Sequence, residues 1–400
     1  MISVSTLLCE SGAAGDGLRY DAADSTDVAQ IRQRKQQHPV VVWNTTTGCN
    51  LDCRHCYAGA RGTPEAGEFD TAEARGLIDE LAAYDVPVLL FSGGEPLLRD
   101  DLVELVEYAS DRGLRPVLSS NGTLLTEARA RELAAAGIAY AGISIDGLPD
   151  RHDTFRGCDG AFAAASAGIA AAQAAGIKTG VRFTVTEQTL PDLPAVLERF
   201  CDRGVDRFCF YHLAYGGRGR DARTTDIDPQ TRRAAVREIC DLTRQYHARD
   251  EPIETLLVGN YADAGYLVEY ARLAIGADRA RRIESFLRTN GGDPAGERVA
   301  DIDAHGNVHP TQFWRSYSMG NVRDRPFAAI WEDDTNPVLD HLRQRPESLG
   351  AVCADCRYSD CCRGGSRLRA LAVHSDRAAP DPQCYLTPTE RGSRSSVSSD

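Results

Sequence analysis

Lysine is almost absent from this sequence. Only two of its 45 basic residues are lysines, Lys35 and Lys178, and the formal net charge is −13. A nucleic-acid-binding protein would carry a basic face, so this balance argues against that class. No apolar run approaches the ~20 residues that a membrane helix needs. The N-terminus also lacks a basic segment followed by an apolar stretch, so we predict neither a membrane span nor a signal peptide.

Cysteine, by contrast, is abundant, with 13 residues in the chain. Because we find no export signal, this number predicts metal or redox chemistry rather than a disulfide scaffold, and we expect a cytoplasmic protein. The length of 400 residues suggests two or three domains, and the hydrophobic content of 42% is that of a globular enzyme.

Three cysteines stand close together in a C-x-x-x-C-x-x-C run. They are Cys49, Cys53 and Cys56. Three thiolates at this spacing can hold three corners of a cubane iron–sulfur cluster and leave the fourth iron without a protein ligand. A small chelating cofactor can bind an open iron of this kind. The alternatives are three unrelated thiols or a zinc knuckle, although zinc sites usually use paired C-x-x-C units and a fourth ligand.

A second group of four cysteines lies near the C-terminus, at Cys353, Cys356, Cys362 and Cys384. Four thiolates can ligate a second cluster completely, with no open iron. Zinc is the alternative metal for this site. Cys361 stands directly before Cys362, and either of the two could be the third ligand.

The pattern of apolar residues predicts strands that alternate with helices from residue 39 onward. We expect six strands, at 40–43, 86–92, 116–120, 140–145, 179–186 and 207–213. The expected helices cover 71–84, 102–112, 126–136, 161–175 and 193–203. This alternation predicts a parallel α/β sheet or barrel. Such barrels place their active sites at the carboxyl ends of the strands.

Composition and patterning suggest five regions. We expect an irregular N-terminal arm at 1–38, the barrel at 39–221, a helical bridging segment at 222–298, an auxiliary cluster domain at 299–388 and a disordered tail at 389–400. Within the fourth region, residues 299–325 have the texture of a hairpin, with His305, Gly306 and Asn307 as its turn.

Polar motifs follow or interrupt the predicted strands. Gly93, Gly94 and Glu95 come after the second strand, where glycines allow a close backbone approach and a carboxylate can hold an ammonium group. Asn121 follows the third strand and begins an Asn-Gly motif. Taken alone, both Asn-Gly and Gly-Gly-Glu-Pro are sequences typical of ordinary turns. Arg182 lies among apolar neighbours inside the fifth strand, so it should have a partner.

The cysteine run, followed one β–α unit later by Gly-Gly-Glu-Pro, resembles the radical S-adenosylmethionine (SAM) enzymes. The four-cysteine group resembles their SPASM-type C-terminal extension, in which the spacing from Cys356 favours Cys362. The resemblance implies a partial (β/α)6 barrel, a SAM-binding [4Fe-4S] cluster, an auxiliary [4Fe-4S] cluster and SAM itself. It also implies cofactor contacts from Tyr57, Gly93, Gly94, Glu95, Asn121, Ser144 and Arg182, with Asp146 as a further position.

Four longer stretches, at 210–219, 308–314, 320–327 and 381–386, resemble enzymes that modify tetrapyrrole side chains in alternative heme and heme d1 synthesis. The start of the chain, including residues 17–20, resembles the deacetylases that remove acetate groups from didecarboxysiroheme. These resemblances imply a tetrapyrrole substrate and an electron donor of the ferredoxin or flavodoxin type. A departure from the related sequences follows Cys362, where Arg363 stands in place of a glycine.

Candidate residues for the substrate follow from the same resemblance. His212 and His309 could ligate the substrate iron or move a proton, and each could equally be bonded to a neighbouring carbonyl. Arginines are natural clamps for carboxylates, and the candidates are Arg218, Arg220, Arg315, Arg367 and Arg369. Three alternatives stay open: a related enzyme that acts on propionates, a peptide-maturation enzyme, and a non-catalytic iron–sulfur carrier.

Overall fold

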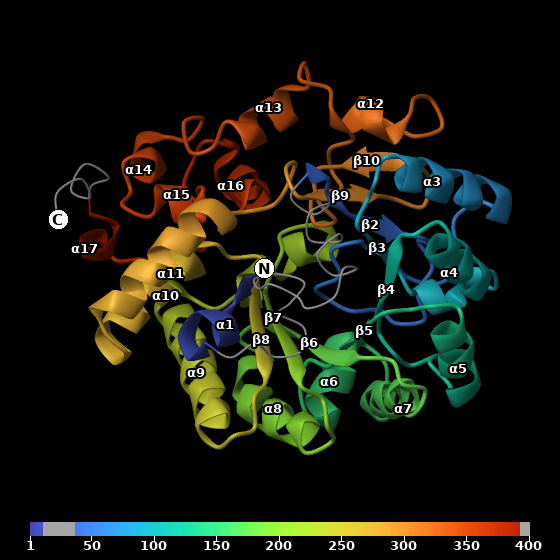
Figure 1. Ribbon diagram of the computed structural model, residues 1–400, viewed down its shortest axis with the longest axis horizontal. Coiled ribbons are helices and arrows are strands. Elements are labelled where there is room, and N and C mark those ends of the chain that lie inside the picture. Colours follow the sequence, from blue (N-terminus) through green and yellow to red (C-terminus); the bar gives the residue numbers. More distant parts are fainter. Residues whose placement is uncertain (11–36, 393–400) are drawn as a thin grey trace.

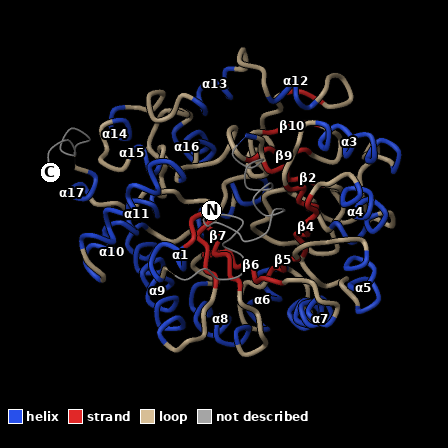
Figure 2. Tube along the Cα trace, in the orientation of Figure 1, coloured by secondary structure: helices blue, strands red, loops and turns tan. Residues whose placement is uncertain are grey.

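The computed structural model describes residues 1–10 and 37–392 of the chain (Figure 1). The sequence motif at 17–20 and most of the proposed arm and tail lie outside the described residues. The strands form one curved sheet in the order β1-β8-β7-β6-β5-β4-β3-β2-β9-β10-β11. Figure 2 shows these strands as an arc, with helices packed along its outer side.

The six predicted strands are confirmed, and they pair in parallel in chain order. They are β2 (Val40–Asn44), β3 (Val88–Ser92), β4 (Arg115–Ser120), β5 (Ala141–Ser144), β6 (Thr179–Val185) and β7 (Arg207–His212). The predicted helices are α3 (Thr71–Ala83), α4 (Leu102–Asp111), α5 (Glu127–Ala135), α7 (Ala161–Ala174) and α8 (Leu193–Cys201). The structure adds α6 (Pro149–Arg156), a mostly polar helix without an apolar stripe long enough to reveal it.

The structure adds two strands within segments that we predicted to be irregular or mostly helical. The bridging segment contains a seventh parallel strand, β8 (Glu254–Val258), whose five residues are all buried beside β7. The first ten residues are ordered, because β1 (Ile2–Ser3) pairs antiparallel with β8 and leads into α1 (Val4–Cys9). The remaining helices of the bridging segment are α9 (Pro229–Ala248), α10 (Ala262–Ala274) and α11 (Ala277–Asn290).

The predicted hairpin is confirmed and continues the sheet beyond β2. Strand β9 (Val299–Ile302) runs parallel to β2 and antiparallel to β10 (Asn307–His309), which pairs with β11 (Gly320–Asn321). Six short helices follow: α12 (Phe327–Trp331), α13 (Pro337–Arg343), α14 (Ala351–Ala354), α15 (Ser359–Cys362), α16 (Arg367–His374) and α17 (Pro388–Arg391). Short 3₁₀ turns lie at η2 (Pro96–Leu98), η3 (Leu190–Asp192), η4 (Gly217–Arg220) and η5 (Ala222–Thr225).

Alternation along the strands gives the sheet a helix-facing side and an inward side. Val41 and Trp43 belong to the main hydrophobic core shared with the helices, so Asn44 points inward. The same alternation turns Ser144 and Arg182 inward, and these two residues stand side by side in the β5–β6 register. Within the described residues, no helix has both the length and the apolar character required to cross a membrane.

Candidate active site

The loop after β2 holds the first three cysteines in a closed turn. Cys49 N–H donates to the Gly62 carbonyl at 3.0 Å, and Cys56 N–H donates to the Cys53 carbonyl at 3.3 Å. Arg218, from the turn after β7, donates through Nε to the Cys53 carbonyl at 2.9 Å. Arg218, a candidate substrate clamp, thus binds the backbone of the cysteine loop.

The surroundings of these thiols fit an iron–sulfur cluster. Cys49 and Cys53 are buried in a small apolar cluster. Burial raises the pKa of Cys49 to about 12, so iron binding, which requires thiolates, must release protons. Arg156 Nη1 lies 3.7 Å from Cys53 Sγ, and Asn121 Nδ2 lies 4.0 Å from Cys49 Sγ. The sulfur atoms of a bound cluster would accept hydrogen bonds from donors placed in this way.

The Gly-Gly-Glu-Pro turn packs backbone to backbone against the cysteine loop. Glu95 N–H donates to the Gly48 carbonyl at 2.8 Å, and Gly94 N–H donates to the Thr46 carbonyl at 2.7 Å. A Cβ on Gly94 would lie 2.6 Å from the Gly48 carbonyl carbon, closer than real Cβ atoms approach. Only glycine therefore fits between the two loops at this position.

Glu95 joins this turn to the next one. Its side chain is fully buried, and it accepts hydrogen bonds from Ser120 Oγ at 2.7 Å, Asn121 N–H at 2.8 Å and Leu97 N–H at 3.1 Å. Burial raises the pKa of Glu95 to about 7 even though these bonds favour the carboxylate. Sequence reasoning missed this structural role, because it depends on a contact between two separate βα turns.

Arg182 crosses the inward face of β5. It donates to Ser119 Oγ on β4, and its Nε is buried without a hydrogen-bond partner among the described residues. A Cβ on Gly142 would lie 2.8 Å from Arg182 Cζ, so the glycine leaves the space that the guanidinium occupies. An unpartnered guanidinium N–H on this face suits a carboxylate ligand. The carboxylate of SAM is a ligand of that kind.

Tyr57, directly after Cys56, belongs to a buried polar chain at the other end of the site. Its hydroxyl lies 3.3 Å from Asn44 Oδ1 and 3.3 Å from Ser92 Oγ, and its ring packs edge-on against Phe313. Asn44 Nδ2 donates to Asp301 Oδ1 at 2.6 Å. Burial raises the pKa of Asp301 to about 7. Sequence reasoning missed Asn44 and Asp301, since only the β2–β9 pairing brings them together.

His212 lies on the helix-facing side of β7. Its Nε2 is 3.0 Å from Asp263 Oδ2, and its Nδ1 is 3.0 Å from Arg232 Nη1. Because an arginine can only donate, Nδ1 accepts, and Nε2 carries the proton that it donates to Asp263. Both ring nitrogens are engaged away from the inward face, so the structure does not bring His212 into the candidate site.

His309 lies on the inward side, opposite Asp301 in the β9–β10 register. Its Nδ1 faces the Tyr317 carbonyl at 2.7 Å, and its Nε2 faces Asp303 Oδ2 at 3.2 Å. Burial alone would lower the pKa of His309, but the hydrogen bond to Asp303 and the charge of Asp301 raise it overall. Two acceptors at the two nitrogens indicate an imidazolium, which cannot ligate iron.

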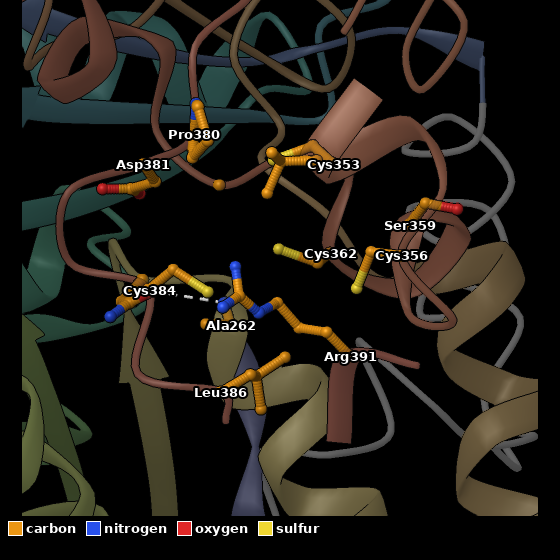
Figure 3. Close-up of a pocket in the computed structure, with 14 residues that line it drawn as sticks. Ala262, Cys353, Cys356, Ser359, Cys362, Pro380, Asp381, Cys384, Leu386 and Arg391 are labelled. Carbon is orange, nitrogen blue, oxygen red and sulfur yellow. Dashed lines mark hydrogen bonds between the residues drawn. The ribbon is translucent and has the colours of Figure 1, made fainter. Parts of the chain in front are cut away.

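The C-terminal cysteines line one cavity. Figure 3 shows Cys353, Cys356, Cys362 and Cys384 around it. Four thiol side chains around one cavity match the ligand set of an iron–sulfur cluster that has no open iron. Cys361 points elsewhere, with its thiol 3.8 Å from the Glu284 carbonyl of α11.

Three further candidate arginines are engaged in structural contacts. Arg367 donates to backbone carbonyls of residues 364, 365, 377 and 379, and Arg369 forms a two-pronged pair with Asp381 at 2.9 and 2.7 Å. Arg315 donates to the Ala58 carbonyl at 3.3 Å. Arg220 is exposed. Among the described residues, Arg220 is thus the candidate clamp for which no structural contact of this kind is seen.

Comparison with known proteins agrees with this geometry. Residues 43–200 match the Radical SAM superfamily, and residues 294–357 match the SPASM iron–sulfur cluster-binding domain, which takes in Cys353 and Cys356. The chain is 42% identical to Fe-coproporphyrin III synthase of Methanosarcina barkeri, over 98% of this chain and 99% of that protein. It is 40% identical to pre-heme d1 synthase of Dinoroseobacter shibae, over 90% of this chain and 89% of the relative.

Solved structures show the same fold. The chain superposes on anSMEcpe with bound AdoMet with a TM-score of 0.67 at 17% identity, over 86% of this chain and 93% of that one. It superposes on Streptococcus suis SuiB with a TM-score of 0.68 at 16% identity, over 90% and 80% of the two chains. Its cofactors are a SAM-binding [4Fe-4S] cluster, an auxiliary iron–sulfur cluster and SAM. The chain belongs to the radical SAM superfamily and carries a C-terminal SPASM domain.

Proposed function

We propose that this protein is a radical SAM enzyme of heme biosynthesis that removes acetate side chains from didecarboxysiroheme to give Fe-coproporphyrin III. The observation that carries the proposal is the end-to-end similarity to Fe-coproporphyrin III synthase, 42% over 98% of the chain. The three-cysteine loop beside the Gly-Gly-Glu-Pro turn supplies the structure that such chemistry requires.

The proposed division of labour assigns each group of residues one task. Cys49, Cys53 and Cys56 hold the SAM-binding cluster, and the cavity cysteines hold the auxiliary one. When bound, the first cluster and SAM supply a 5′-deoxyadenosyl radical that takes a hydrogen atom from the substrate. Arg182 binds the SAM carboxylate through its free Nε. The other proposed SAM contacts are Tyr57, Gly93, Gly94, Glu95, Asn121 and Ser144.

The role of Glu95 in this assignment is indirect. Its carboxylate already accepts three hydrogen bonds, so it shapes the turn whose backbone would face the amino group of SAM. His309 stays a proposed proton-transfer residue, because its imidazolium adjoins the buried Asp301. For His212 we propose a structural role, because Arg232 and Asp263 engage both of its nitrogens.

The electron donor and the compartment belong to the same proposal. Reduction of the SAM-binding cluster requires a low-potential donor of the ferredoxin or flavodoxin type. None of the thirteen cysteines, all of which the structure describes, forms a disulfide, and this suits a reducing cytoplasm.

Anaerobic turnover of the reconstituted protein with didecarboxysiroheme, SAM and a reductant tests the proposal. We expect product masses that correspond to the loss of one and then two acetate side chains, together with 5′-deoxyadenosine. The variant Cys53→Ala should produce neither. If 5′-deoxyadenosine accumulates while the pigment mass stays unchanged, the substrate assignment is wrong although the enzyme class stands.

A second candidate function has its own support. The 40% identity to pre-heme d1 synthase is close to the 42% of the first relative, so a reaction on propionate side chains is the main competitor. Mass spectrometry distinguishes the two, because loss of acetate groups and modification of propionates change the pigment mass by different amounts.

A further inference from the structure

Arg391 reaches into the cavity of the C-terminal cysteines. Figure 3 shows its side chain extending into the cavity, with the guanidinium group beside Cys384 and facing Cys362. Its Nε is buried and has no hydrogen-bond partner in the part of the chain that the structure describes. A buried guanidinium N–H without an acceptor is costly, and it therefore points to an acceptor that binds in the cavity.

The position of Arg391 is fixed from outside the cavity. It is the last residue of α17, whose first turn is closed by a capping box between Thr387 and Glu390. Glu390 also forms a two-pronged ion pair with Arg233 of α9, at 2.9 and 2.5 Å. The Arg391 carbonyl accepts a hydrogen bond from Arg357 N–H at 2.7 Å. The helix is thus attached both to α9 and to the residue that follows Cys356.

The neighbouring charges leave Arg391 as a cation directed at the sulfurs. The nearby carboxylate of Asp381 is paired with Arg369, and the guanidinium of Arg367 is bound to backbone carbonyls. Arg391 lines the same cavity as Cys353, Cys356 and Cys384.

We propose that Arg391 donates N–H hydrogen bonds to sulfur atoms of the auxiliary cluster and raises its reduction potential. A cluster with four thiolate ligands is an anion, and it gains another negative charge when an external donor supplies one electron. A fixed cation and N–H donors at its edge stabilise the reduced form more than the oxidised form. The proposal concerns the cluster and does not depend on which substrate side chain is attacked.

The test is an electron paramagnetic resonance redox titration of the auxiliary cluster. The full chain carries Cys49→Ala, Cys53→Ala and Cys56→Ala, so that only this cluster reports. In this background, Arg391→Met should lower the equilibrium constant for one-electron reduction of the cluster about tenfold or more. A tenfold change corresponds to a reduction potential lower by about 59 mV. A matched control, Arg131→Met on the exposed surface of α5, should leave the potential unchanged.

A second variant keeps the test decisive if Arg391→Met assembles less iron. Glu390→Gln retains the capping box, which glutamine also supports, but removes the charge that pairs with Arg233. It should lower the potential in the same direction by a smaller amount, because α17 is held less firmly. An unchanged potential in iron-replete Arg391→Met, or in Glu390→Gln where the first variant does not assemble, would overturn the proposal. Neither result depends on the acetate-removal assay.

Discussion

Gly142→Ala should weaken SAM binding without a change at any residue that contacts the cofactor in our proposal. The added methyl group would lie 2.8 Å from Arg182 Cζ, whereas real Cβ atoms do not come within 3.0 Å. Strand β5 cannot retreat, because it pairs with β4 on one side and β6 on the other. The guanidinium must therefore move and give up both Ser119 and the position of its free Nε.

The size of the effect follows from the bond that is lost. A charge-assisted hydrogen bond contributes about 1.5–3 kcal/mol, which corresponds to SAM binding weaker by roughly ten- to a hundredfold. Equilibrium binding of SAM to the anaerobically reconstituted protein measures it, with iron content expected to stay unchanged. Gly76→Ala is the matched control, because it lies in α3 with open space around it. Unaltered SAM affinity in both Gly142→Ala and Arg182→Met would refute the role of Arg182.

Three further predictions address the two cysteine sites and the buried acid. Gly94→Ala should abolish most assembly of the SAM-binding cluster, measured as iron per chain, because the methyl group would collide with the Gly48 carbonyl; full iron content would contradict this. Cys362→Ala should lose the auxiliary cluster signal, whereas Cys361→Ala should keep it and cost on the order of 1 kcal/mol of stability for its buried thiol. The Asp301→Asn variant should gain stability relative to the parent protein as pH rises from about 4 to about 7. Thermal unfolding of both proteins across this pH range measures the difference. Burial raises the folded-state pKa of Asp301 to about 7, so the folded protein binds the extra proton in that window and loses stability as pH rises. We expect a gain of about 4 kcal/mol by neutral pH, and a difference independent of pH would show that Asp301 is not perturbed.

The barrel was predictable because its strands are long apolar runs between amphipathic helices. The period of the pattern located β2 to β7 within a few residues at each end. Strand β8 escaped prediction because it has only five residues, all buried, between two long helices, and a short apolar run of this kind reads equally well as helix. Strand β1 has two residues and owes its structure to pairing with β8.

Side-chain direction was the part of the site that the sequence left open. His212 and His309 each follow an apolar strand pattern and looked equivalent as candidates. In the structure, His212 shares its face with Phe208 and Phe210, which pack in the main core, whereas His309 shares its face with Asp301. A shift of one position along a strand moves a side chain to the other face of the sheet. Strand pairing, which sequence alone does not give, decides which histidine faces the inward side of the sheet.

Cys361 and Cys362 show the same principle on a helix. Neighbouring residues on α15 point about 100° apart, so only one of the two thiols can face the cavity. The packing of α15 against the end of α11 decides which thiol faces the cavity. Gly291, at the end of α11, allows this close packing, because a Cβ there would come within 3.0 Å of the Cys361 carbonyl oxygen and keep the two segments apart. This close contact directs Cys361 toward Glu284 and leaves Cys362 at the cavity wall. A Gly291→Ala variant should therefore reduce auxiliary-cluster assembly, measured as iron per chain, although residue 291 does not line the cavity.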